Sequence, residues 1–174
     1  MLSSKHFFKS AKLSKIGYFC KKTIEMVRIA TRSDAAKIVN FQLKMALETE
    51  ELSLDFTTVE KGVAAVFDDP SKGCYFVAEE EGVVVGSLMI TFEWSDWRNG
   101  LVWWIQSVYV APEFRKRGVF ARMYHHVKKQ VETSDDIRGL RLYVDNRNVS
   151  AKEVYMRMGM NGAHYTTYEW MRTF

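Results

Sequence analysis

A short basic segment, RKRG, stands at residues 115–118 between a predicted strand and a predicted helix. Such a turn directs several backbone N–H groups toward one point at the N-terminus of a helix, where the helix dipole is positive. Gly118 lets the backbone approach an anion closely and adopt dihedral angles that a Cβ disfavours. Arg115, Lys116 and Arg117 add positive charge. The segment predicts a diphosphate-binding loop, although an ordinary solvated basic loop can have the same sequence.

A second segment that could do chemistry follows at residues 148–160, NVSAKEVYMRMGM. It predicts a helix in which Asn148 and Tyr155 are about two turns apart, so both side chains lie on one face and can border one elongated ligand. The strand that precedes this helix is predicted to lie next to the strand that leads into RKRG. The two segments are therefore expected to meet at one site.

The elements that position these segments alternate along the chain. The pattern predicts strands at residues 26–30, 74–78, 83–91, 101–110 and 140–144, a helix from its N-cap Ser33 to about Glu48, helices over 57–67, 118–133 and 150–158, and a terminal strand pair around 163–171. We see no internal repeat and no linker. Residues 26–174 are therefore predicted to form one mixed α/β domain.

Charge separates the first 25 residues from this domain. They carry six lysines and one acid, Glu25, so their net charge is +5 and residues 26–174 carry −1 of the total of +4. The nearly neutral remainder argues against a nucleic-acid partner. We predict a flexible basic extension over residues 1–25 or translation from an upstream start codon. A transit peptide is the other alternative, but such peptides favour Arg.

Composition argues against membrane, disulfide and metal proteins. No apolar run approaches the roughly 20 residues that cross a bilayer, so we expect no spanning helix. The cysteines, Cys20 and Cys74, form no CxxC pair, which fits a reducing compartment and a cytoplasmic location. The four histidines show no metal-ligand spacing, so we expect no metal site.

Together, the two segments resemble the motifs of the GNAT superfamily of acetyl-CoA-dependent N-acetyltransferases. Motif A of that family is a strand, then Arg/Gln-x-x-Gly-x-Gly/Ala, then a helix, and RKRGVF (115–120) is similar to it. Motif B is an Asn-x-x-Ala-x-x-x-Tyr helix followed by Gly and an aliphatic or aromatic residue, as in NVSAKEVY (148–155) with GM (159–160). The resemblance covers residues 26–174. It implies the acyl-CoA N-acyltransferase fold, a mostly antiparallel twisted sheet of about seven strands flanked by four helices.

The resemblance implies acetyl-CoA as cosubstrate and a set of contacts to it. In the family, amides at the end of the fourth strand pair with the pantetheine arm, loop amides hold the diphosphate, and the motif B Asn contacts the arm. The corresponding residues here are Val108, Tyr109 and Val110 for the strand, Arg115, Lys116, Arg117, Gly118, Val119, Phe120 and Ala121 for the loop, and Asn148.

The resemblance also implies direct acetyl transfer to a primary amine in a ternary complex. The motif B tyrosine, here Tyr155, protonates the departing thiolate in such enzymes. The acceptor must first lose a proton, because an ammonium with a pKa of about 10.4 cannot attack. A strand N–H near Tyr109 can stabilise the developing oxyanion. A catalytically weak or inactive coenzyme A-binding regulatory module is the alternative function, and both a monomer and a homodimer are compatible with the sequence.

Phe120 departs from the family pattern, which has Gly or Ala at this position. Phe120, Tyr124, Val127 and Val131 form one helical stripe, and such a stripe predicts burial. We therefore expect the Phe120 ring to lie in the core and to leave the loop amides open.

Gln106 is the second departure, because several GNAT enzymes place a glutamate base there and an amide accepts no proton at useful pH. We expect Glu93 to be the base. Glu48, Glu50 or an ordered-water relay are the alternatives.

Four tryptophans, Trp94, Trp97, Trp103 and Trp104, surround the same strand. Trp103 and Trp104 must face opposite sides of it, so at least one belongs to the core. An aromatic wall with acids nearby suits a small cationic amine. Polyamines, aminoglycoside-like amines and amino acids fit, and a protein amine also stays open as the acceptor.

Overall fold

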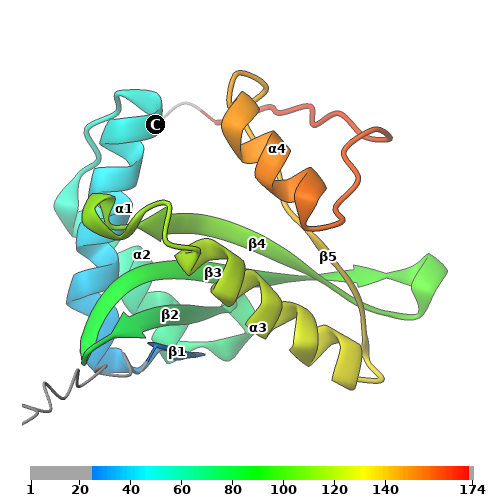
Figure 1. Cartoon of the computed structure of the whole chain (residues 1–174), viewed down its shortest axis with the longest axis horizontal. Coiled ribbons are helices and arrows are strands. Elements are labelled where there is room, and N and C mark those ends of the chain that lie inside the picture. Colours follow the sequence, from blue (N-terminus) through cyan, green and yellow to red (C-terminus); the bar gives the residue numbers. More distant parts are fainter. Residues whose placement is uncertain (1–24, 173–174) are drawn as a thin grey trace, which may run out of the picture.

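The computed structural model describes residues 25–172, which form a curved sheet with helices on both faces (Figure 1). The strands are β1 (Glu25–Ile29), β2 (Cys74–Glu80), β3 (Val83–Ser95), β4 (Gly100–Val110) and β5 (Ile137–Arg141), in this order across the sheet. The pairs β1–β2, β2–β3 and β3–β4 are antiparallel, whereas β5 runs parallel to β4. A parallel neighbour requires a crossover, and α3 (Val119–Thr133) provides it.

Two apolar layers hold the helices on the sheet. The helices α1 (Ala35–Glu50) and α2 (Phe56–Asp68) cover one face through a cluster that includes Ile38, Val63 and Val77. The helix α3 covers the other face, where Met123 and Val127 pack against strand residues. Alternate residues of a strand point to opposite faces, so the central strands supply both layers. Within residues 25–172, no helix has the length and hydropathy needed to cross a membrane.

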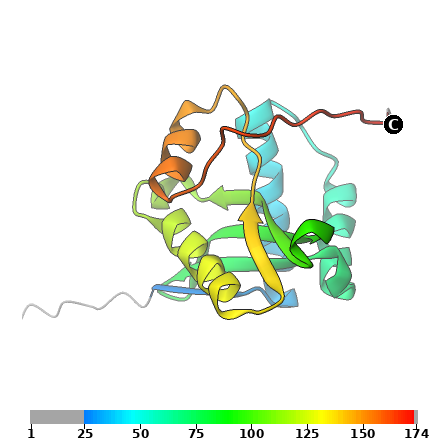
Figure 2. The same cartoon turned by 90° about the vertical axis from the view of Figure 1, so that its right-hand side faces the viewer.

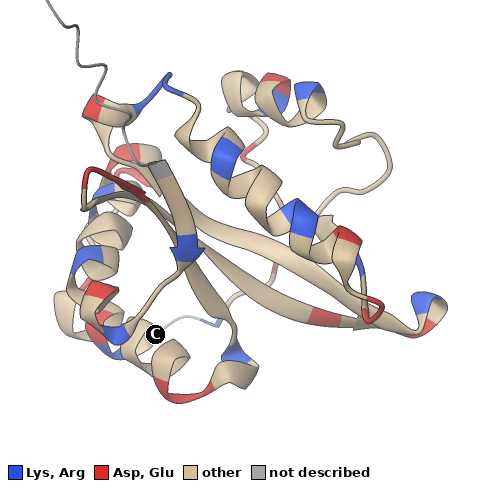
Figure 3. Ribbon diagram, turned by 60° about the horizontal axis from the view of Figure 1, so that its bottom comes forward, with Lys and Arg blue, Asp and Glu red and all other residues tan. Residues whose placement is uncertain are grey.

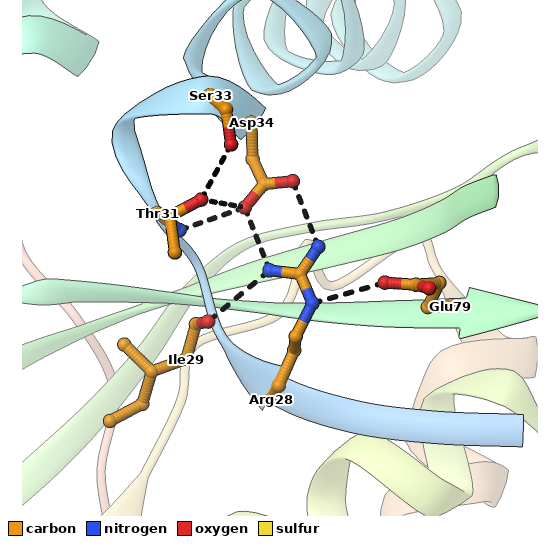
Figure 4. Close-up of polar contacts among 6 residues, drawn as sticks. All are labelled: Arg28, Ile29, Thr31, Ser33, Asp34 and Glu79. Atoms are coloured by element: carbon orange, nitrogen blue, oxygen red, sulfur yellow. Dashed lines mark hydrogen bonds and ion pairs between the residues drawn. The ribbon is translucent and has the colours of Figure 1, made fainter. Parts of the chain in front are cut away.

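The start of α1 is fixed by an ion-pair network (Figure 4). The Asp34 carboxylate accepts hydrogen bonds from the Arg28 guanidinium at 2.8 and 3.0 Å and from the Thr31 backbone N–H at 2.7 Å. Arg28 also donates to Glu79 at 3.0 Å. The bonds from Arg28 and Thr31 lower the pKa of Asp34 to about 2. The prediction of Ser33 as N-cap was wrong, because Thr31 caps a short 3-10 turn that leads into α1.

The C-terminal third differs from the prediction in two places. The strand β5 covers residues 137–141 rather than 140–144, because its ladder with β4 ends at Trp104 opposite Arg141. The predicted strand pair around 163–171 is absent from the described chain. After α4 (Val149–Arg157), residues 159–172 run as irregular chain (Figure 2). Aromatic side chains there, such as Tyr168 and Trp170, are exposed, so no buried face selects a strand.

The described residues therefore contain five strands rather than about seven. The mixed α/β class and the four predicted α-helices are confirmed. The predicted basic extension over residues 1–25 lies outside the described residues, except that Glu25 begins β1.

Candidate active site

At the β5 edge of the sheet, the strands β4 and β5 separate midway along β4 (Figure 1). Their parallel pairing runs from Leu101 opposite Ile137 to Trp104 opposite Arg141 and goes no further. On its other side, β4 contains a bulge, because the register with β3 shifts where Ser107 adopts a φ of 51°. A bulge bends a strand and changes the direction of the following backbone groups. After the bulge, the second half of β4 is therefore no longer paired with β5.

A cleft of about 620 Å³ lies at this separation. Its walls are the end of α1, the second half of β4, the chain after β5, and α4. The lining residues include Glu48, Thr49, Glu50, Gln106, Ser107, Val108, Tyr143, Asp145, Arg147, Asn148 and Tyr155. Asn148 and Tyr155 therefore meet Val108 at one cleft, as the spacing of the two segments implied.

In the second half of β4, the backbone groups of alternate residues point away from β3, toward the gap beside β5. Ala111 donates its N–H to the Val85 carbonyl oxygen of β3 at 2.9 Å. Successive residues of a strand direct their N–H and C=O groups to opposite sides, so Tyr109 also bonds toward β3, while Val108 and Val110 point toward the gap beside β5. Of the three predicted strand amides, the geometry thus offers those of Val108 and Val110 to an extended ligand.

The turn before α3 and the first residues of that helix present a row of N–H groups, and we call this segment the anion loop (residues 116–121). Lys116 and Gly118 have φ angles of 61° and 77°, in the left-handed region. The first bond of α3 runs from Arg122 N–H to the Gly118 oxygen at 3.0 Å, so the preceding N–H groups have no acceptor within the helix. Arg115 is different, because its N–H donates to Pro112. Figure 3 shows basic residues in the chain that leads into α3.

The Arg115 side chain connects the anion loop with α1. Its guanidinium donates to Glu48 at 2.5 Å and to the Val110 carbonyl oxygen at 2.9 Å, and it stacks on the Tyr109 ring at 5.4 Å. The Tyr109 hydroxyl donates to the same Glu48 carboxylate at 2.7 Å. Hydrogen bonds from Arg115 and then Tyr109 lower the pKa of Glu48. Burial, followed by the bond to Glu48, raises the pKa of Tyr109 to about 12.

Tyr155 packs against the residue that departs from motif A. The Phe120 and Tyr155 rings make an edge contact with centroids 5.7 Å apart, and Phe120 also contacts Tyr124 at 6.4 Å. Phe120 is partly buried against the core cluster, which confirms the prediction that its ring is a core residue. Burial raises the pKa of the Tyr155 hydroxyl, so the group keeps its proton at neutral pH.

Asn148 has a divided role at the start of α4. Its side-chain oxygen accepts the Ala151 N–H at 3.0 Å and caps the helix. An amide side chain also has two N–H donors, and those of Asn148 are available to a ligand in the cleft that this residue lines.

Glu93, the predicted base, does not belong to the residues that line the cleft. One of its oxygens accepts from Arg141 at 2.6 Å and the other from the Trp104 indole N–H at 2.5 Å. Glu48 and Glu50, the alternatives, do line it. Trp103 packs on the core while Trp104 faces the other side of β4, as the strand alternation predicted.

Several residues of the cleft wall were missed from the sequence, among them Tyr143, Asp145 and Arg147. They follow β5. That strand was predicted at residues 140–144, too late in the chain, and these residues were therefore not recognised as part of the site. Their position just after a strand parallel to β4 was the available signal. Among residues 25–172, no group of three or more His, Cys, Asp or Glu residues could hold a metal ion.

Comparisons with known proteins agree with this geometry. Residues 41–160 match the model of the acetyltransferase (GNAT) family. A possible acetyltransferase from Clostridium difficile 630 is 39% identical, with a TM-score of 0.81 over 86% of this chain and 99% of that one. A comparison with curated proteins gave no match.

Two more distant structures share the fold. An aminoglycoside N-acetyltransferase in complex with CoA has a TM-score of 0.70 at 15% identity, over 88% of this chain and 99% of that one. A ribosomal-protein-alanine N-acetyltransferase from Brucella melitensis biovar Abortus 2308 also scores 0.70, at 12% identity over 86% and 99%. The named acceptors of these two proteins differ. Because the family model matches most of its length, the chain belongs to the GNAT acetyltransferase family.

Proposed function

We propose that the protein transfers the acetyl group of acetyl-CoA to a primary amine of a small cationic acceptor. The observation that carries the proposal is the row of N–H groups over residues 116–121, which lack acceptors in α3. Phe120 in this row contacts the ring of Tyr155, which lines the cleft. Such groups at a helix N-terminus suit a diphosphate. Acetyl-CoA supplies a thioester carbon that an amine can attack.

Different residues bind the cofactor, orient it and donate the proton in this reaction. The anion loop binds the diphosphate, and Val108, Val110 and Asn148 orient the pantetheine arm. As the new C–N bond forms and the C–S bond breaks, the amine loses one proton and the departing sulfur gains one. Tyr155 donates the latter, because burial keeps its hydroxyl protonated.

The proton of the amine needs an acceptor in the cleft. Glu93 does not line the cleft, whereas Glu48 does. We therefore assign the proton acceptor to Glu48 through an intervening water, in place of Glu93. Two donors, Arg115 and Tyr109, hold this carboxylate charged at the cleft wall.

The test is release of the CoA thiol from acetyl-CoA with a panel of amines. Tyr155→Phe is expected to lower kcat about 100-fold, the usual contribution of a general acid. Tyr124→Phe is the matched control. Like Tyr155, Tyr124 contacts the Phe120 ring, but it does not line the cleft. Unchanged turnover in Tyr155→Phe would remove the acid role from this residue.

A coenzyme A-binding regulatory module is the second candidate. Gln106 in the cleft and the engaged carboxylate of Glu93 favour it, because both reduce the number of bases. Calorimetric binding of acetyl-CoA without thiol release for any amine in the panel would support this candidate against the enzyme.

A further inference from the structure

We propose that Glu50 selects acceptors that keep a second positive charge besides the amine that reacts, which makes a small diamine or polyamine the acceptor class. This proposal rests on the proposed acetyl transfer and adds a specificity-determining residue to it. It follows from the partners of the carboxylates at and beside the cleft.

Two carboxylates of the cleft wall are already neutralised by cations of the protein. Glu48 accepts hydrogen bonds from Arg115 and Tyr109. Asp145 holds Arg147 in a local ion pair, in which the guanidinium Nε lies 3.1 Å from both carboxylate oxygens and a terminal nitrogen lies 2.6 Å from one of them. Neither group presents an unbalanced charge to a ligand.

The Trp104 ring, a candidate site for a cationic acceptor, is also occupied. The Arg141 guanidinium lies over the Trp104 ring at 5.7 Å and over Tyr165 at 5.9 Å, and it forms an ion pair with Glu93 at 2.6 Å. A cation of the protein therefore fills the place where an acceptor cation could stack on Trp104. The charge of the acceptor must be recognised elsewhere.

Glu50 is the lining carboxylate that remains. It is the last residue of α1 and is exposed on the cleft wall. Within residues 25–172, its side chain has neither a hydrogen bond nor an ion pair. The nearby charge of Arg147 acts on Glu50, but Arg147 is bound to Asp145, so these three groups together carry one negative charge.

An unbalanced carboxylate in this cleft fits a charge that the acceptor retains during the reaction. The attacking amine must be neutral, so it cannot be recognised by charge at the moment of attack. A second amine with a pKa of about 10.4 stays protonated at neutral pH. A diamine can therefore place one neutral nitrogen at the thioester and one ammonium beside Glu50.

The experiment compares diaminobutane with butylamine, which differ in the second amine, as acceptors for the full chain. The wild-type protein is expected to show the lower KM for diaminobutane. Glu50→Gln is expected to raise that KM about threefold to fivefold, the upper part of the range of an exposed ion pair, while kcat for the same acceptor stays within twofold. The preference is also expected to fall as salt is added.

Glu51→Gln is the matched control, because Glu51 is an exposed neighbour that does not line the cleft. Equal KM values for the two amines in the wild type, or an unchanged KM ratio in Glu50→Gln, would overturn the role of Glu50 and leave acetyl transfer standing. Absence of thiol release with both amines and with the wider amine panel would remove the proposed function and this inference together.

Discussion

Gly118 offers a test that separates anion binding from backbone stability. Its φ is 77°, and a Cβ built there would meet no atom nearer than the Arg122 guanidinium nitrogen at 3.8 Å. Gly82, in the turn between β2 and β3, has a φ of 81° and nothing within 4 Å. An alanine at either position therefore has the same conformational cost and no steric clash within the free protein.

The magnitudes follow from that symmetry. A left-handed conformation costs an L-residue about 1–2 kcal/mol, which should lower Tm by roughly 2–8 °C in a domain of this size for both variants. Gly118, unlike Gly82, belongs to the anion loop, so only the Gly118→Ala methyl group is expected to disturb a diphosphate bound there. Displacing the diphosphate from one charge-assisted N–H bond costs about 1.5–3 kcal/mol, or about tenfold to 150-fold in Kd.

Isothermal titration calorimetry with CoA and thermal unfolding of both variants make the comparison. We expect equal losses of Tm and a weaker Kd for CoA in Gly118→Ala alone. If Gly118→Ala bound CoA as tightly as Gly82→Ala does, the diphosphate would not lie on the amides of residues 116–121, and the reasoning about the anion loop would be wrong.

Two further predictions concern a partly buried ring, Phe120, and a buried ion pair, that of Asp34. Phe120→Ala should lower the free energy of unfolding by about 2 kcal/mol, because the ring is partly buried. It should also lower kcat, because Tyr155 loses a packing partner, while the Kd for CoA stays unchanged. Denaturant unfolding, calorimetry and thiol release measure these effects, and a large change in Kd would mean that the ring takes part in cofactor binding. The pKa of Asp34 is lowered from 3.8 to about 2, and its side chain is only 8% exposed. Its ion pair therefore contributes about 2 kcal/mol to the free energy of unfolding. This contribution is complete above about pH 3.8 and is lost as the pH falls through about 2. Asp34→Asn should lack this step in unfolding free energy between about pH 4 and 2, and persistence of the full step in the variant would assign it to other carboxylates.

The local sequence determined the parts of the site that are backbone. Gly118 follows a basic turn and precedes a helix, and the left-handed φ at this position could be anticipated because a glycine accepts it without strain. The seven-residue spacing of Asn148 and Tyr155 likewise fixed their common face, because helical geometry is set by adjacent residues. The burial of Phe120 followed from the same periodicity.

The partners of charged side chains were decided only by the tertiary structure. Glu93 was predicted to be the base, but the register of β3, β4 and β5 puts Trp104 and Arg141 within hydrogen-bonding distance of it. Glu48 meets Tyr109 and Arg115, which are more than sixty positions away. Whether a carboxylate serves as a base, a positioning group or half of an ion pair depends on such distant neighbours, and a linear pattern of residues does not encode those distances.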